Sequence, residues 1–97
     1  MKIQWSPFAI DRVTNIAQYI AEDKPTAADK WIVSIFDAVG KLSSFPKLGR
    51  IVPELNVDEI REILHGNYRI IYQISSSVVE ILTIRYCSQI LPDDEII

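Results

Sequence analysis

The chain has 97 residues, 48% of them apolar and 24% charged, which is the balance expected of one globular domain. This composition excludes a disordered or low-complexity protein, and no uncharged stretch approaches the roughly 20 apolar residues of a membrane span. The first residues lack the apolar run of a signal peptide, and a single cysteine excludes an internal disulfide. We therefore expect a cytoplasmic protein without a membrane partner.

The net charge of −3 is unevenly distributed along the chain. Residues 1–92 contain ten Lys or Arg and ten Asp or Glu, so the whole negative surplus lies in residues 93–97. We expect one domain over 1–92, followed by a short acidic tail over 93–97. A body with balanced charge lacks the broad basic field that drives non-specific binding to nucleic acid.

The first half of the chain predicts a strand and two helices. Residues 2–5 alternate in polarity, as a short strand does. Ser6 followed by Pro7 is typical of a helix start, because serine caps the first turn and proline needs no hydrogen-bond acceptor there. Apolar residues then recur every three or four positions as far as residue 21, and again over 28–42. The short break between the two stripes predicts an antiparallel helix hairpin.

The second half predicts three strands. Residues 46–53 contain proline and glycine and are expected to be irregular. Three runs rich in isoleucine and tyrosine follow at 59–65, 68–75 and 78–86, separated by two-residue breaks that are typical of hairpins. The order β-α-α-β-β-β predicts an α+β fold, in which the helix hairpin covers one face of a sheet completed by an antiparallel meander.

The sequence offers little for metal or cofactor chemistry. One histidine and one cysteine provide no zinc site, and no glycine-rich phosphate loop precedes a helix. We therefore expect neither a metal nor a cofactor. His65 beside Gly66 is typical of a turn, and an imidazole is also a common general acid or base.

Arginine and tyrosine are the main candidates for binding. The three predicted strands each carry one arginine, and a further arginine precedes them. The planar guanidinium suits carboxylate or phosphate, and its mixture with tyrosine suits single-stranded RNA or a protein carboxylate. The structural alternative is that Arg61 or Arg69 pairs across the sheet with Glu59, Glu62 or Glu80. The candidate residues for binding a target or a protein partner are Arg50, Arg61, Tyr68, Arg69, Tyr72 and Arg85.

Several short motifs in this order resemble the toxins of the RelE/ParE family of type II toxin–antitoxin systems. The match runs from about residue 2 to residue 91. Its most specific parts are Phe45-Pro46 followed by Gly49-Arg50, and the run Tyr68-Arg69-Ile70-Ile71-Tyr72. The resemblance implies a cytoplasmic toxin that is neutralised by a cognate antitoxin and reaches operator DNA only through that antitoxin. RelE-like members cut messenger RNA on the ribosome, whereas ParE-like members inhibit DNA gyrase without acting as enzymes.

The residues favour the ParE-like branch. Arg69 matches one member of the basic cluster of the RelE-like nucleases and Arg61 lies near another. The lysine pair beside Arg61 is missing, however, and so is the arginine usual after the last strand, near Ser88 or Gln89. We expect action on gyrase, with two alternatives left open: a ribosome-dependent mRNA endonuclease, or a non-toxic co-repressor that only binds its antitoxin. If the chain were a nuclease, its catalytic candidates would be Arg61, His65, Arg69, Arg85 and Tyr86.

Overall fold

The computed structural model describes residues 1–88 of the chain. Its elements are β1 (Lys2–Trp5), α1 (Pro7–Asp23), α2 (Pro25–Gly40), the 3-10 helix η1 (Lys41–Ser43), β2 (Arg50–Ile51), β3 (Ile60–His65), β4 (Tyr68–Ile74) and β5 (Val78–Tyr86). They confirm the predicted order of elements, with two additions, η1 and β2. β2 was not predicted, because two residues are too few to show a strand period. The predicted tail over 93–97 and the predicted domain end at residue 92 lie outside the described residues.

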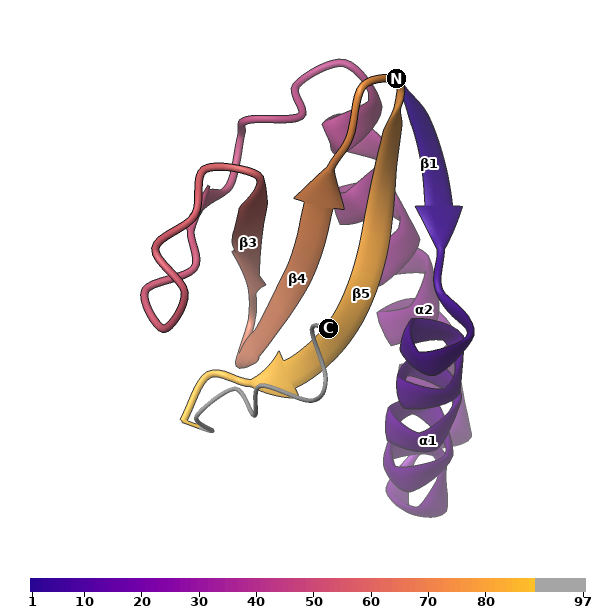
Figure 1. Ribbon diagram of the computed structural model, residues 1–97. Helices are drawn as coiled ribbons and strands as arrows, with labels where there is room; N and C mark the ends of the chain where they lie inside the picture. The colour runs from indigo at the N-terminus through magenta and orange to yellow at the C-terminus, as the bar shows by residue number, and fades with distance from the viewer. Residues whose placement is uncertain (89–97) are drawn as a thin grey trace.

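The strands form one sheet in the order β1-β5-β4-β3-β2, and the helix hairpin packs against one of its faces (Figure 1). The predicted α+β fold is confirmed. The meander β3-β4-β5 is antiparallel, as predicted, whereas β1 joins β5 in parallel, so that the sheet is mixed. A parallel pair needs a long crossover connection, and the chain between β1 and β5, which includes both helices, provides one.

Ser6 fastens the first helix to the sheet. Its hydroxyl oxygen accepts a hydrogen bond from the Ala9 amide at 3.0 Å and donates one to the Leu82 carbonyl of β5 at 3.0 Å. The cap predicted from Ser6 and Pro7 is therefore present, and it has a second partner. One turn further along α1, Arg12 Nε donates to the Ile84 carbonyl at 3.0 Å. Together these side chains cover carbonyl groups of β5 beyond the end of β1.

The two faces of the sheet have different coverings. The main core lies between the sheet and the helices, where side chains such as Ile35 and Leu42 are fully buried. We call the face away from the helices the outer face. There a smaller apolar cluster forms, because Val52 from the β2–β3 connection packs against Ile71 and Leu82. The outer face is therefore partly covered by the chain that leads into β3.

A β-bulge decides which arginines share a face. Tyr72 lies opposite Ile81, but its neighbour Ile71 lies opposite Thr83, so that Leu82 is an extra residue in β5. Beyond the bulge Arg69 lies directly opposite Arg85. Because residues opposite each other in antiparallel strands point to the same side, both arginines belong to the outer face.

In residues 1–88 no helix combines the length and the apolar character that a bilayer crossing requires.

Candidate functional site

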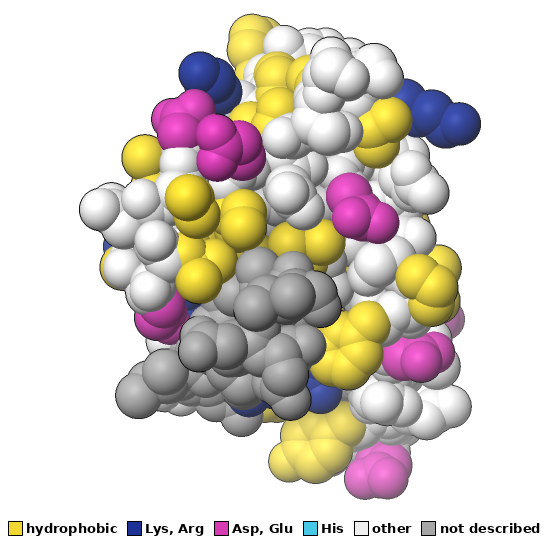
Figure 2. Space-filling view, in the orientation of Figure 1, with side chains coloured by type: hydrophobic (Ala, Val, Ile, Leu, Met, Phe, Trp, Pro, Cys, Tyr) yellow, Lys and Arg dark blue, Asp and Glu magenta, His cyan; other side chains and the backbone are white. Residues whose placement is uncertain are grey.

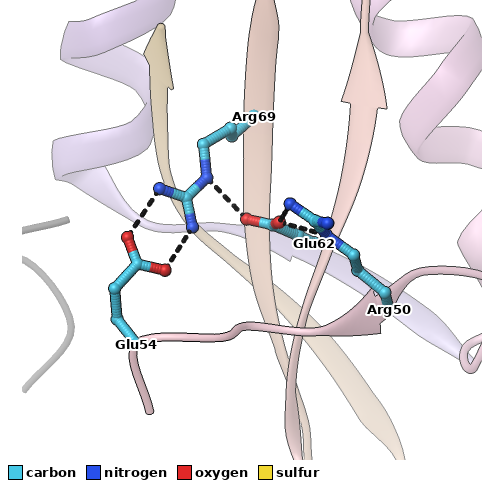
Figure 3. Close-up of polar contacts among 4 residues, drawn as sticks. All are labelled: Arg50, Glu54, Glu62 and Arg69. Carbon is cyan, nitrogen blue, oxygen red and sulfur yellow. Dashed lines mark hydrogen bonds and ion pairs between the residues drawn. The ribbon is translucent and has the colours of Figure 1, made fainter. Parts of the chain in front are cut away.

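Arg69 is the centre of a polar network on the outer face (Figure 3). Its Nη1 and Nη2 atoms donate to the two carboxylate oxygens of Glu54, at 2.8 and 2.7 Å, and its Nε donates to Glu62 Oε1 at 2.6 Å. This paired geometry is the strongest form of an arginine–carboxylate contact. Arg69 is 5% exposed, and its hydrogen bonds with Glu54 raise its pKa above the ordinary value although burial opposes them.

Glu62 joins two arginines. It is 1% exposed, and while one of its oxygens accepts from Arg69, the other lies 2.6 Å from both Nε and Nη2 of Arg50. Arg50 itself is largely exposed, because it stands on the short edge strand β2. The alternative that Arg69 pairs with a glutamate across the sheet is thus confirmed, and the partner is Glu62. Its other partner, Glu54, gave no signal in the sequence, because a glutamate in an irregular loop carries no periodic pattern.

Arg61 lies on the other face, where it links two loops. The hairpin register places it opposite Tyr72, whose side chain is fully buried on the helix side. Its Nη1 donates to the Gly49 carbonyl at 3.0 Å, and its Nη2 contacts Asp58 Oδ1 at 2.7 Å. The partner is Asp58 rather than the cross-strand glutamates considered from the sequence. Arg61 therefore does not join Arg69 in one cluster.

Tyr72 explains the spacing of the motif around Gly49. Its hydroxyl donates to the Pro46 carbonyl at 2.7 Å and accepts from the Gly49 amide at 2.9 Å. A Cβ atom on Gly49 would lie 2.4 Å from the Glu62 carbonyl oxygen, so only glycine fits there. Burial raises the pKa of Tyr72. The Tyr72 side chain is fully buried in this conformation and cannot contact a partner; its hydroxyl holds the loop between Pro46 and Gly49 in place.

The remaining aromatic candidates form a row across three strands on the helix side. His65, Tyr68 and Tyr86 lie opposite one another on β3, β4 and β5. The Tyr68 ring packs against Trp31 of α2 at 5.3 Å and against Tyr86 at 4.8 Å, and His65 Nε2 lies 3.0 Å from Ser34 Oγ. Burial, together with the hydrogen bond to Tyr86, raises the pKa of Tyr68 to about 12. Tyr68 is therefore a protonated hydroxyl at neutral pH.

The candidate nuclease residues are divided between the two faces. Arg69 and Arg85 belong to the outer face, whereas Arg61, His65 and Tyr86 belong to the helix side. Outside the grey atoms, Figure 2 shows the lysine and arginine side chains of the outer side as separate groups rather than a continuous basic patch. Within residues 1–88 there is also no group of three or more side chains arranged to hold a metal ion.

Two hollows on the surface could receive a partner. The first is an apolar groove of about 450 Å³ between the two helices, floored by residues such as Val13, Ala17 and Ile32. The second has about 360 Å³ and lies at the free side of β3, between Leu48, Lys41 and Leu64. Neither hollow was predicted in detail, because a groove depends on how neighbouring elements pack.

The fold and the site define a small α+β protein whose strand arginines are held mainly by its own carboxylates and loop carbonyls. A solved structure described as the chromosomal ParDE TA system from P. aeruginosa has the same fold, with a TM-score of 0.74 over 89% of this chain and 95% of that chain, at 20% identity. The curated protein named "Putative toxin Y4kP" from Sinorhizobium fredii (strain NBRC 101917 / NGR234) is 34% identical over 93 residues, which are 94% of this chain and 93% of that protein.

Residues 3–91 match the family described as ParE toxin of type II toxin–antitoxin system, parDE. The chain therefore belongs to the ParE toxin family. This finding confirms the resemblance drawn from the sequence, and it also confirms the choice of the ParE-like branch within the wider RelE/ParE group.

Proposed function

We propose that this toxin stops growth by binding DNA gyrase in the cytoplasm, and that a cognate antitoxin neutralises it. Membership of the ParE family supports a gyrase target, because ParE-like toxins are the branch that inhibits this enzyme. The domain responsible comprises residues 1–92. Contact with operator DNA occurs only through the antitoxin, since the body of the toxin carries no net positive charge.

The observation that carries this proposal is the internal neutralisation of Arg69. A nuclease needs cationic groups that face the transferring phosphoryl group and are free to stabilise its charge. A guanidinium has five N–H donors, and Arg69 already uses three of them in hydrogen bonds with Glu54 and Glu62. A phosphate would have to displace a bidentate carboxylate to reach it. This arrangement supports a toxin that acts by binding a protein rather than by cutting RNA.

The positions of the candidate nuclease residues on the sheet also argue against RNA cleavage. Arg61 points to the opposite side of the sheet from Arg69, so the two cannot approach one phosphate together without a change of register. His65 and Tyr86 also lie on the helix side, away from Arg69. Ribosome-dependent mRNA cleavage therefore remains the weaker alternative. A non-toxic co-repressor is the third outcome that an experiment must separate.

The decisive experiment is inducible expression of the chain alone, with supercoiling by purified gyrase and transcript cleavage measured in parallel. The proposal expects growth arrest, loss of gyrase-dependent supercoiling and intact transcripts. Arrest with cleaved transcripts would favour the endonuclease and overturn the gyrase target. Normal growth with a confirmed folded protein would favour the co-repressor. An equal amount of toxin mixed with its antitoxin serves as the matched control, because it should restore supercoiling.

A further inference from the structure

The loop between η1 and β2 has a main chain that is held by internal hydrogen bonds. It comprises residues 45–49 and follows the end of α2 that lies away from the turn between the helices (Figure 1). The Phe45 amide donates to the Lys41 carbonyl, and the Phe45 carbonyl accepts from the Leu48 amide, both at 3.0 Å. The hydroxyl of the buried Tyr72 binds two more main-chain groups of this loop, at 2.7 and 2.9 Å. The 45–49 loop is therefore ordered before any partner arrives, which lowers the entropic cost of binding.

The same loop exposes two large apolar side chains. Phe45 is 65% exposed and Leu48 is 56% exposed. One exposed apolar residue is common on a protein surface and needs no explanation. Two of them on one ordered loop, one of them aromatic, are typical of a protein interface, where aromatic side chains are enriched. The hydrogen bonds of the 45–49 loop thus fix the main chain that carries Phe45 and Leu48.

Positive charge surrounds these two side chains. Residues 38–53 contain no Asp or Glu, and they contain three cations: Lys41, Lys47 and Arg50. Lys41 and Arg50 line the hollow of about 360 Å³ together with Leu48. The Lys47 side chain is 68% exposed and lies 3.6 Å from the equally exposed Asp58, a contact that water and salt screen. The segment is locally basic in a body whose charges otherwise balance, so it favours an acidic partner.

These features suit a protein partner better than a nucleic acid. Recognition of unpaired bases needs flat side chains for stacking and free polar groups for the base edges. The 45–49 loop offers one ring, and its amides at Phe45, Leu48 and Gly49 already have acceptors within the chain. Three cations are also few beside the basic surface that holds a phosphate backbone. The loop therefore matches a protein surface that has an apolar pocket with acidic residues at its rim.

We propose that the 45–49 loop is the surface by which the toxin binds gyrase. The Phe45 ring enters an apolar pocket of gyrase, Leu48 packs at the rim of that pocket, and Lys47 faces acidic side chains beside it. This inference rests on the proposed gyrase target and assigns the contact that reaches it. It also gives the buried Tyr72 hydroxyl a part in target recognition, because that hydroxyl positions the main chain of the loop.

The test compares Phe45→Ala with Phe8→Ala, a matched control at a second exposed phenylalanine, which is 45% exposed on α1. The readout is the concentration of purified toxin that half-inhibits supercoiling by purified gyrase. We expect this concentration to rise at least about tenfold for Phe45→Ala, as for an interface residue that dominates binding, and less than about twofold for Phe8→Ala. Thermal unfolding should be unchanged in Phe45→Ala, because its ring is largely exposed.

A charge variant provides a second, independent readout. Lys47→Glu should slow association of the toxin with immobilised gyrase by about three- to tenfold, and the effect should shrink as salt is added. Lys30→Glu, on the exposed side of α2, is the matched control and should leave the association rate unchanged. Far-UV circular dichroism of both variants checks that they are folded.

The outcomes separate this inference from the proposed function. If wild-type toxin neither binds nor inhibits gyrase, the target is wrong, and this contact is wrong with it. If the wild type inhibits gyrase and Phe45→Ala and Lys47→Glu match their controls, the target stands and the assignment of the loop alone is overturned.

Other roles of the loop, and another gyrase contact, give distinct results. If Phe45→Ala weakens binding of the purified antitoxin or of single-stranded RNA but inhibits gyrase like the wild type, the loop serves that partner and the proposal is wrong. If Phe36→Ala in the groove between the helices abolishes gyrase binding while Phe45→Ala retains it, gyrase binds the helices and the proposal is equally wrong.

Discussion

Arg69 and Arg85 lie directly opposite each other on β4 and β5, so two like charges are neighbours on one sheet face. Like charges in this position normally destabilise a sheet. Glu54 and Glu62 offset the repulsion at Arg69, one from the loop before β3 and one from β3 itself. The bulge at Leu82 brings Arg85 next to Arg69, because without this extra residue the Arg85 side chain would point toward the helices.

Replacing Arg69 should cost stability before it changes any target contact. Arg69→Ala removes one of the two arginines that contact the buried Glu62, leaving Arg50, and it also removes the ion pair with Glu54. Breaking a buried pair from one side typically costs about 3–5 kcal/mol, so we expect a loss of that order in the free energy of unfolding. Urea unfolding measures it, with the exposed Lys30→Ala as control. A folded, fully stable and fully toxic Arg69→Ala protein would mean that the network contributes little to the free energy of unfolding.

The loop that precedes β2 should depend on the hydroxyl of Tyr72. Tyr72→Phe leaves the Pro46 carbonyl and the Gly49 amide without their partner in a buried place, which costs about 1–3 kcal/mol. Gly49→Ala should cost at least as much, because its Cβ would meet the main chain of Glu62. Gly40→Ala is the matched control, since a Cβ there has nothing within 4 Å. Equal melting temperatures for Gly49→Ala and Gly40→Ala would contradict this explanation of the motif.

The sequence predicted the elements well, because the apolar periods and the proline and glycine breaks are local signals. The faces of the arginines were not predictable in the same way. A two-residue turn places His65 opposite Tyr68, so odd positions of β3 share a face with even positions of β4. Arg61 and Arg69, both odd, therefore separate. On the next strand the bulge at Leu82 shifts the register again and brings Arg85 to the side of Arg69.

The partners of the arginines were foreseen only in part. Glu62 was a visible candidate because it lies in a neighbouring strand. Glu54 was not, since its place depends on how the connection after β2 folds over the outer face, where Val52 packs against Ile71. The short strand β2 and the uncovered end of β3 follow from the same long-range packing.

Stability should fall at high pH through Tyr68. Folding raises the pKa of this phenol from 10.0 to about 12, so the protonated hydroxyl stabilises the folded state. Its contribution is complete below pH 10 and is lost as the pH rises toward 12. We expect the unfolding free energy of wild type to decline more steeply over this range than that of Tyr68→Phe. Parallel curves for the two proteins would contradict a coupling through Tyr68.

Releasing Arg69 from Glu54 tests whether a hidden nuclease exists. Glu54→Gln keeps the size of the side chain but removes the charge that pairs with Arg69. The change should lower the unfolding free energy by about 1.5–3 kcal/mol, the value of a hydrogen bond to a charged group, and it should produce no transcript cleavage. Arg61 would still lie on the other face, so a released Arg69 gains no second cation from that strand. Northern analysis of transcripts after induction measures the outcome, with Asp58→Asn as the matched control at the Arg61 pair. New cleavage in Glu54→Gln alone would show that Glu54 restrains a catalytic arginine, and the choice of gyrase over RNA would then be wrong.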